Sequence, residues 1–337
     1  MIASASGRCC AARASGSRSS RPPAPPRPQA EHSALKGTDL SEDGGFEAIA
    51  RGIAAQVGGE CAPEPQSGVS GGGVHRTYRW RCGDTLLFVK VAGQGGGAGL
   101  EAEATGLLAL AGAQAVRVPR LLARGAAGQG AFLALEWIES QPAGRAAERR
   151  LGEQLAAQHA VTAERFGFES DNFIGRTPQP NGWLPDWVEF FRERRLRHQL
   201  ALAVQSGFAE LLENPGARLL ESVDALLAGH RPRASLLHGD LWAGNWLADS
   251  QDEPVIFDPA AYYGDREADL AMTRLFGGFG RAFYDAYQDA APLPAGHVVR
   301  AELYNLYHVL NHANLFGGGY ARQARVSIER LLAEVRG

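Results

Sequence analysis

The stretch LLHGDLWAGNWLADSQDEPVIFDPA, residues 236–260, places three oxygen-bearing side chains on turns that follow apolar runs. Asp240 comes first, Asn245 follows five residues later, and Asp258 ends a second apolar run just before Pro259. Hard oxygen ligands of this kind suit Mg²⁺ and the phosphate groups that it accompanies. The stretch therefore predicts a site where a metal and a phosphate-bearing ligand meet.

The spacing of these residues indicates phosphoryl transfer. An Asp followed by an Asn five residues later has the spacing of a kinase catalytic loop. In that reaction a protein has to orient a hydroxyl group and to neutralise the charge of the phosphates with a metal. We expect Asp240 to accept the hydroxyl proton, and Asn245 and Asp258 to hold Mg²⁺.

Composition limits the class of protein. With 337 residues, 45% of them hydrophobic, the chain is long enough for about two domains or one large bilobal one. The net charge of −3 and the lack of an apolar run that could cross a bilayer predict neither a nucleic-acid nor a membrane partner. The four cysteines show neither zinc-site spacing nor the density of a disulfide scaffold, so we expect a reducing, cytoplasmic setting. Redox control through Cys61 stays open.

Residues 1–42 differ from the rest of the chain. They begin with a segment rich in Arg, Ser, Ala and Pro, and the first acidic residue is Glu31. Such a segment buries too little apolar surface to fold. Its composition also fits an organelle transit peptide, although its prolines oppose an amphipathic helix. We expect a disordered or targeting extension, with an organelle as the alternative location.

The remainder reads as a sheet-rich half followed by a helical half. In the first half, apolar spacing predicts helices at 46–57 and 99–111 and strands at 78–82, 85–91, 116–125 and 131–139. In the second half, we predict helices at about 145–160, 186–205, 215–229, 281–290, 298–316 and 322–335. The expected boundary lies near residue 139, between an N-terminal lobe, 43–139, and a C-terminal lobe, 140–337.

Lys90 is one of only two lysines among 34 basic residues, and it lies in an apolar strand. An ammonium is a compact point charge suited to phosphate oxygens, although a solvent-facing lysine is the alternative. Just upstream, Gly71, Gly72 and Gly73 permit a tight turn whose amides can approach phosphates. Glu103 falls on the apolar stripe of its helix, where a carboxylate needs a partner such as Lys90. At the edge of that stripe it would instead face solvent.

Several motifs together resemble one family. The runs HGDLWAGN, VIFDPAAYYGDREADLAM and LFGGF are similar to those of the fructosamine 3-kinase (ketosamine 3-kinase) family, a branch of the aminoglycoside phosphotransferase type. So are the stretches at 164–183, 186–196 and 304–320. The resemblance covers the chain from about residue 46 to its end. It implies an α+β, bilobal protein kinase-like fold, with a small N-terminal lobe of antiparallel sheet and one helix and a larger, mostly helical C-terminal lobe.

The same resemblance implies an activity. Members are ATP- and Mg²⁺-dependent kinases of the 3-hydroxyl of a ketosamine, a sugar joined to an amine, and the unstable ester then releases the amine. The implied substrates are small fructosamines or ribulosamines, or glycated proteins. Because a fold does not define the acceptor, a kinase of another alcohol, of the aminoglycoside, choline or homoserine type, is the alternative. A non-catalytic nucleotide-binding protein ranks last because the expected site residues are all present.

The resemblance also implies roles for single residues. Lys90 resembles the lysine that contacts the ATP phosphates, and Glu103 resembles its helix partner. Asp240 resembles the catalytic base, while Asn245 and Asp258 resemble the metal ligands.

Four further positions take expected roles. Trp242 would stack on the ketose ring, its alternative being a core tryptophan. His238 would support the catalytic loop, and Asp269 would brace that loop through its backbone. Backbone groups in the strand end formed by Glu136, Trp137 and Ile138 would bind adenine.

Overall fold

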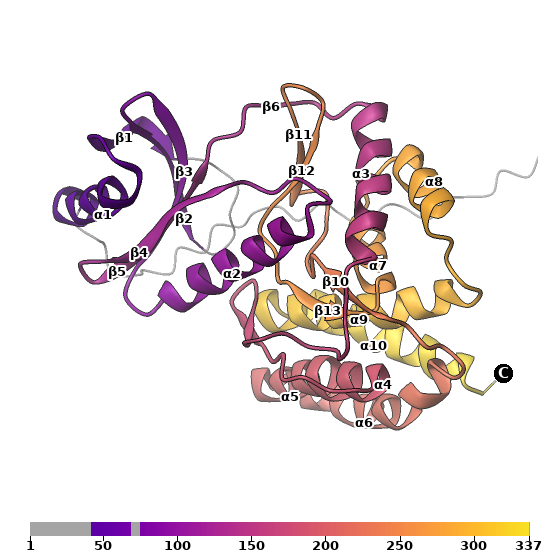
Figure 1. Cartoon of the computed structure of the whole chain (residues 1–337). Helices are drawn as coiled ribbons and strands as arrows, with labels where there is room; N and C mark the ends of the chain where they lie inside the picture. The colour runs from indigo at the N-terminus through magenta and orange to yellow at the C-terminus, as the bar shows by residue number, and fades with distance from the viewer. Residues whose placement is uncertain (1–41, 69–74, 337) are drawn as a thin grey trace, which may run out of the picture. The chain divides into compact units, whose positions relative to one another are not determined.

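The structure, a computed structural model, describes residues 42–68 and 75–336. An antiparallel sheet forms most of the N-terminal part of this region, and helices form most of the C-terminal part (Figure 1). The mixed α+β architecture predicted from the sequence is therefore confirmed. The residue boundary predicted near 139 falls between the last strand of the N-terminal sheet and the next short strand.

The N-terminal sheet has the strand order β1-β2-β3-β5-β4, and its neighbouring strands are antiparallel. Its register places Lys90 of β3 opposite Thr77 of β2 on one side and Leu133 of β5 on the other. Two helices accompany the sheet, as the apolar spacing predicts, whereas the family resemblance implied one. The bounds are α1 Glu42–Val57, β1 Cys61–Gly68, β2 Arg76–Cys82, β3 Thr85–Ala92, α2 Gly97–Ala113, β4 Leu121–Ala127 and β5 Gly130–Glu136.

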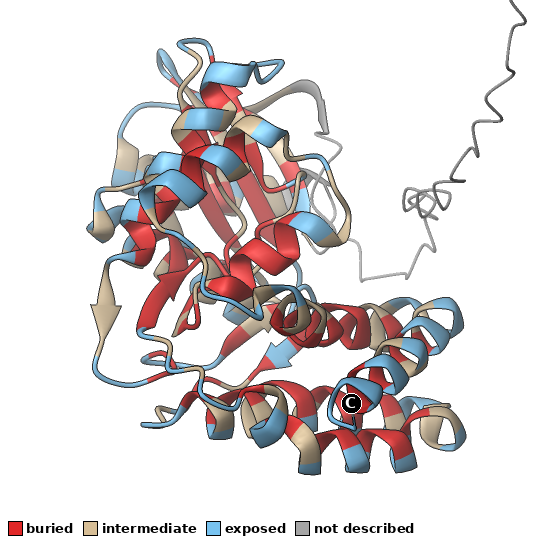
Figure 2. Cartoon of the chain, turned by 90° about the vertical axis from the view of Figure 1, so that its right-hand side faces the viewer, coloured by how far each residue is buried: buried red, intermediate tan, exposed pale blue. Residues whose placement is uncertain are grey.

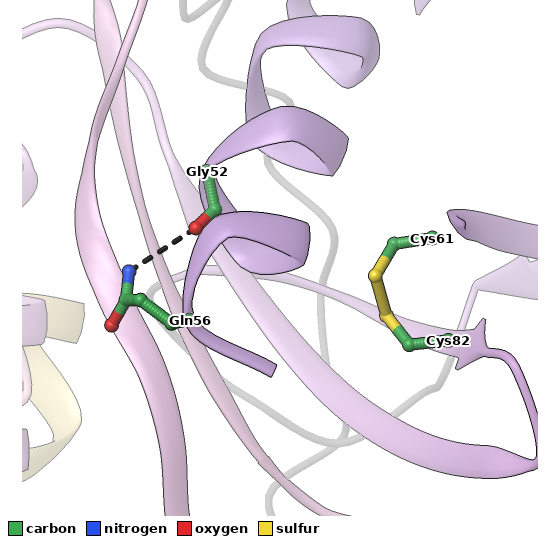
Figure 3. Close-up of a disulfide and its surroundings, with 4 residues drawn as sticks. All are labelled: Gly52, Gln56, Cys61 and Cys82. Carbon is green, nitrogen blue, oxygen red and sulfur yellow. Dashed lines mark hydrogen bonds between the residues drawn. A yellow bond between two sulfur atoms is a disulfide. The ribbon is translucent and has the colours of Figure 1, made fainter. Parts of the chain in front are cut away.

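A disulfide joins the first two strands of this sheet. Cys61 and Cys82 are direct partners in the register of β1 and β2, and their sulfur atoms are bonded (Figure 3). Nearby, Gln56 at the end of α1 donates a hydrogen bond to the carbonyl of Gly52 and another to that of Arg124 in β4. The sequence left redox control through Cys61 open and did not predict this pairing, because cysteine spacing does not reveal which residues face each other across two strands.

Helices dominate the C-terminal part, where α3 packs against α8 and α9 packs against α7 and α10. The predicted helix at 186–205 is present as alternating α and π segments. The helix predicted at 215–229 begins earlier, at Ala209, so Pro215 lies inside it and not in its first turn. The bounds are α3 Arg145–His159, α4 Trp187–Phe190, η1 Phe191–Arg197, α5 His198–Ala203, η2 Val204–Phe208, α6 Ala209–Leu226, α7 Glu267–Leu275, α8 Arg281–Ala290, α9 His297–Phe316 and α10 Gly318–Glu334.

Short strands between these helices carry most of the turns on which the predicted site residues stand. They pair in the orders β13-β10-β7, β12-β11-β6 and β8-β9. The bounds are β6 Ser140–Gln141, β7 Thr162–Ala163, β8 Asn172–Ile174, β9 Thr177–Gln179, β10 Ala234–Leu237, β11 Trp246–Asp249, β12 Pro254–Ile256 and β13 Tyr262–Gly264.

Apolar side chains from both halves pack together. One core cluster contains Leu107 of α2 and Leu133 of β5 together with Leu151 of α3, Ile256 of β12 and Phe283 of α8. Figure 2 shows the buried residues along the strands of the sheet and the inner faces of the helices. Within the part of the chain that the structure describes, no helix has the length and apolar character needed to cross a membrane.

Candidate active site

The catalytic loop begins where strand β10 ends. This strand is buried along its whole length, and it leads into a turn formed by His238, Gly239 and Asp240. Gly239 has a φ of 81°, a conformation that glycine adopts without steric cost. A Cβ atom at Gly239 would lie 2.1 Å from the carbonyl oxygen of Ala260. The turn therefore brings the backbone before Asp240 directly against the segment that follows Asp258.

Asp269 braces this turn through the backbone, in the way predicted. Its Oδ2 accepts a hydrogen bond from the amide of His238 at 2.7 Å, and its Oδ1 accepts one from the amide of Gly239 at 2.8 Å. Burial alone would raise the pKa of Asp269, but His159, whose Nε2 lies 3.2 Å from Oδ2, and the backbone hydrogen bonds hold it below its usual range. Asp269 therefore stays ionised, and His159 joins the site as a support that the sequence did not identify.

His238 also acts as a support. Its Nε2 lies 2.9 Å from the carbonyl oxygen of Phe257, and its Nδ1 accepts a hydrogen bond from the amide of Asp240 at 3.3 Å. The imidazole has no exposed surface, and burial lowers its pKa. A neutral imidazole with both nitrogens engaged joins the catalytic loop to the residue before Asp258, and it is not placed to act as a base.

Asn245 and Asp258 converge on Asp240. The amide nitrogen of Asn245 donates to the carbonyl oxygen of Asp240 at 2.9 Å and lies 3.3 Å from its Oδ2. Asp258 has a φ of 58°, which is uncommon for a residue with a side chain, although aspartate adopts it more readily than most. Because the nitrogen of Asn245 faces Asp240, its amide oxygen is the atom left for a cation. The amide oxygen of Asn245 and the carboxylate of Asp258 are the kinds of oxygen donor that suit Mg²⁺.

Burial, and then the charge of Asp258, raises the pKa of Asp240 to about 7. The hydrogen bond from Asn245 acts in the opposite direction. A carboxyl group whose pKa lies near neutrality can take up a proton from a hydroxyl group and release it again. A cation bound beside Asp258 would reduce the repulsion and favour the ionised form.

Lys90 joins the two halves of the site. Its Nζ lies 2.7 Å and 2.8 Å from the two carboxylate oxygens of Glu103 in α2 and 2.5 Å from Oδ1 of Asp258. Burial alone would lower the pKa of Lys90, but these two carboxylates outweigh it and raise the pKa. The predicted pairing of Lys90 with Glu103 is present, whereas Glu101 is exposed and pairs with Arg124.

Trp242 lies on the same loop as Asp240 and keeps part of its surface exposed. Its indole covers Gly244, where a Cβ atom would lie 2.3 Å from the ring. The rings of Trp242 and Phe276 are nearly perpendicular, with 6.3 Å between their centroids. This partly exposed position favours the predicted stacking on a sugar over the alternative of a core tryptophan.

The segment predicted to bind adenine is already partly engaged. The amide of Glu136 donates to the carbonyl of Arg120, and that of Trp137 donates to the carbonyl of Leu86. The carboxylate of Glu136 pairs with Arg117 and Arg120. The amides of Glu136 and Trp137 are therefore already used in backbone hydrogen bonds. The amide of Ile138 and the carbonyl groups of the segment remain the candidates for binding adenine.

The predicted phosphate-binding glycines Gly71, Gly72 and Gly73 lie outside the described residues.

His75 is a candidate site residue that the sequence analysis missed. A Cβ atom on Gly99 of α2 would lie 3.3 Å from its Nε2. Burial, and then the charge of Lys90, lowers the pKa of His75 to about 4. The sequence does carry a signal for His75. Thr77 pairs with Lys90 across the sheet, and residues two apart in a strand share a face, so His75 is expected on the same face as Thr77.

A second group of possible metal ligands lies away from this site, among the described residues. Atoms of His230, Asp265 and Glu267 come within 4.8 Å of one another. Both oxygens of Glu267 accept hydrogen bonds from Arg300, and Asp265 accepts one from Tyr304. These carboxylates already have partners, so we assign this group a structural role.

The comparison with known proteins identifies the family. The family model for fructosamine kinase matches residues 45–334. The chain belongs to the fructosamine kinase family. Its relatives include a probable ketoamine kinase of Synechocystis, 43% identical over 288 residues, which are 85% of this chain and 97% of the relative. The chloroplastic protein-ribulosamine 3-kinase of Oryza sativa is 39% identical over 269 residues, which are 79% of this chain and 78% of the relative.

Solved structures support the same assignment. A crystal structure of a Haemophilus somnus protein assigned as a fructosamine-3-kinase matches with a TM-score of 0.79 and 27% identity, over 87% of this chain and 100% of that one. A thermostable mutant of the aminoglycoside phosphotransferase APH(4)-Ia, in complex with AMP-PNP and hygromycin B, matches with a TM-score of 0.57 and 16% identity, over 86% and 98%. The second likeness concerns the fold alone. The kinase-like fold predicted from the sequence is confirmed, and the chain is a phosphotransferase.

Proposed function

We propose that this chain transfers the γ-phosphoryl group of ATP, with Mg²⁺, to the 3-hydroxyl of ketosamines. The acceptors are fructosamine or ribulosamine adducts of small amines or of protein lysines, and the unstable ester then releases the amine. The observation that carries the proposal is the convergence of Lys90, Asp258, Asn245 and Asp240 in a chain of the fructosamine kinase family.

Each residue of the site has its own role in this reaction. Asp240 accepts the proton of the acceptor hydroxyl while the oxygen forms a bond to the γ-phosphorus and the bond to the leaving ADP oxygen breaks. Lys90 binds phosphate oxygens, and Glu103 holds its ammonium in place. Asn245 and Asp258 would hold Mg²⁺, which when bound neutralises the charge on the transferring phosphates.

Trp242 would present its flat face to the C–H side of the sugar, beside Asp240. The names of the relatives, ketoamine kinase and protein-ribulosamine 3-kinase, support an acceptor of the ketosamine class for this chain.

The test is transfer of labelled γ-phosphate from Mg-ATP to a small fructosamine and a ribulosamine, with choline and an aminoglycoside in parallel. We expect labelling of a ketosamine, at the 3-position by NMR, and none with Asp240→Asn, which should still bind ADP. Clear transfer to choline or the aminoglycoside without ketosamine labelling would contradict the proposed acceptor and keep the kinase mechanism.

A further inference from the structure

Five buried polar side chains that the proposed mechanism does not use form one hydrogen-bonded network beside the Asp258 turn. We call this network the amide brace. It combines side chains of the stretch 164–183, which carried part of the family resemblance, with one side chain each from η1 and α9. Buried polar groups cost free energy unless they are hydrogen-bonded, so the network calls for an explanation in terms of what it holds. Its members are Asn172, Gln179, Asn181, Arg195 and Tyr307.

One branch of the brace runs from Arg195 to the backbone. A guanidinium group can only donate, and Nη2 of Arg195 donates to Oδ1 of Asn181 at 2.7 Å. Nδ2 of Asn181 then donates to Oδ1 of Asn172 at 2.8 Å, and Nδ2 of Asn172 donates to the carbonyl of Ala261 at 2.8 Å. Because the first group only donates and the last only accepts, both ends require the same orientation of the two amides.

The second branch starts at Tyr307. Its hydroxyl donates to Oε1 of Gln179 at 2.6 Å, which turns Nε2 of Gln179 toward the carbonyl of Ala260, at 3.1 Å, and toward Oδ1 of Asn172, at 2.7 Å. The two branches therefore end on the carbonyls of the successive residues Ala260 and Ala261. These residues follow Asp258 by two and three positions.

The other side of Ala260 contacts the catalytic loop. Its amide donates to the carbonyl of His238 at 2.9 Å, and its carbonyl oxygen leaves no room for a Cβ atom on Gly239. Ala260 thus lies between the brace and the residues that lead into Asp240. A shift of this carbonyl would displace the turn of Asp258, the turn of Asp240, or both.

Arg195 starts the brace without a carboxylate partner among the described residues. It has no exposed surface, and its guanidinium carbon lies 4.1 Å from the ring centroid of Tyr262 and 4.7 Å from that of Phe190. It also donates to the carbonyl of Pro180 at 2.6 Å. Aromatic faces and carbonyl oxygens therefore hold the buried cation, and its hydrogen bond to Asn181 is not weakened by a competing ion pair.

We propose that the amide brace is a positioning device that sets where Asp258 stands relative to Asp240, and thereby the affinity of the site for Mg²⁺. The inference rests on the proposed function, which assigns Asp258 to the metal. The members of the amide brace are positioning residues, since they act through the backbone of Ala260 and Ala261. Groups that orient metal ligands typically change metal affinity or activity by about 10–100-fold when removed.

The test compares Tyr307→Phe and Gln179→Met with Leu331→Ala, a buried core residue of α10 outside the brace and the site. Calorimetry measures ADP binding over a series of Mg²⁺ concentrations, and steady-state kinetics gives kcat. In the two brace variants, we expect about a tenfold rise in the Mg²⁺ concentration for half-maximal effect and a similar fall in kcat. Their ADP affinity without Mg²⁺ should stay that of the wild type. Leu331→Ala should lower Tm without either change.

Three outcomes decide the matter. If the brace variants lose only Tm, as Leu331→Ala does, the network is merely structural and the inference is overturned. Should Gln179→Met fail to fold, Tyr307→Phe decides alone, because it removes a single oxygen. If Mg²⁺ has no effect on ADP binding in the wild type, the proposed function fails before any variant is compared, and the inference falls with it.

Discussion

Nζ of Lys90 lies 2.5 Å from Oδ1 of Asp258, although 168 residues separate them. The lysine stands on β3 of the N-terminal sheet, and the aspartate follows β12 in the C-terminal part. This ion pair is therefore a direct bond between the strand that would carry the phosphate-binding lysine and the turn that would carry a metal ligand. Glu103 of α2 also binds the ammonium group of Lys90.

Replacing Lys90 should therefore affect both parts of the site. We expect Lys90→Met to lower kcat/KM for ATP by at least about 100-fold, because a charge preorganised for the transferring phosphates is lost. Lys90→Arg should restore little of it, because a planar guanidinium cannot take the place of a compact ammonium between two carboxylates. Steady-state kinetics at saturating acceptor measures this. Activity of Lys90→Arg close to that of the wild type would disprove a phosphate-binding role that depends on this geometry.

Asp240→Asn should stabilise the metal-free protein while it abolishes transfer. The folded state raises the pKa of Asp240 from 3.8 to about 7, so ionised Asp240 destabilises the fold. This cost is absent below about pH 4 and complete above about pH 7. We expect Tm of Asp240→Asn to exceed that of the wild type by about 2 °C or more at pH 8 and to match it near pH 4. Thermal denaturation without Mg²⁺ checks this, and a lower Tm of the variant at pH 8 would contradict it.

The activity itself should show an acidic limb. Asp240 has to be ionised to accept the hydroxyl proton, so activity is lost as pH falls through its folded pKa, which is about 7 without a metal. A cation beside Asp258 would reduce the repulsion between the carboxylates of Asp258 and Asp240, so the loss of activity would then occur at lower pH. We expect kcat/KM for the acceptor to fall about tenfold per pH unit below that point. A profile that stays flat down to pH 5 would argue against Asp240 as the base.

Trp242 should control the acceptor and not the nucleotide. Its partly exposed indole beside Asp240 would offer a face to a sugar, so Trp242→Leu should raise KM for the ketosamine about tenfold, in line with the loss of a stacking contact of about 1–1.5 kcal/mol. KM for ATP should stay unchanged. Trp80→Phe, a fully buried substitution in the N-terminal sheet, serves as the control for a general loss of stability. Equal changes in both KM values would exclude a specific acceptor contact.

The pairing of Cys61 with Cys82 should be visible in solution. It closes a loop across a sequence separation of 21 residues, which in the chain-entropy model stabilises the fold by about 3 kcal/mol. We expect Cys82→Ala to lower Tm and to abolish the effect of a reductant on Tm. Alkylation under non-reducing conditions, followed by peptide mass spectrometry, should leave Cys61 unmodified in the wild type. Quantitative labelling of both cysteines in the folded protein would show that they are free thiols.

The sequence by itself determined the parts of this protein that depend on local spacing. The turn with Asp240 and Asn245, the strand before Asp258, the stripe that turns Glu103 inward and the lysine within an apolar strand were all predicted, because strand and helix periods define which side chains share a face. One exception is the helix predicted from residue 215, which begins at Ala209 instead, with Pro215 inside it.

Only the tertiary structure decided which distant segments meet. It brought Lys90 to Asp258, His159 to Asp269 and Cys61 to Cys82. It also showed that the amides of Glu136 and Trp137 serve the sheet, and that Asn172 and Gln179 end on the backbone after Asp258. These contacts depend on strand register and on the packing of elements far apart in the chain. A single sequence specifies both, but its local periodicity does not reveal them.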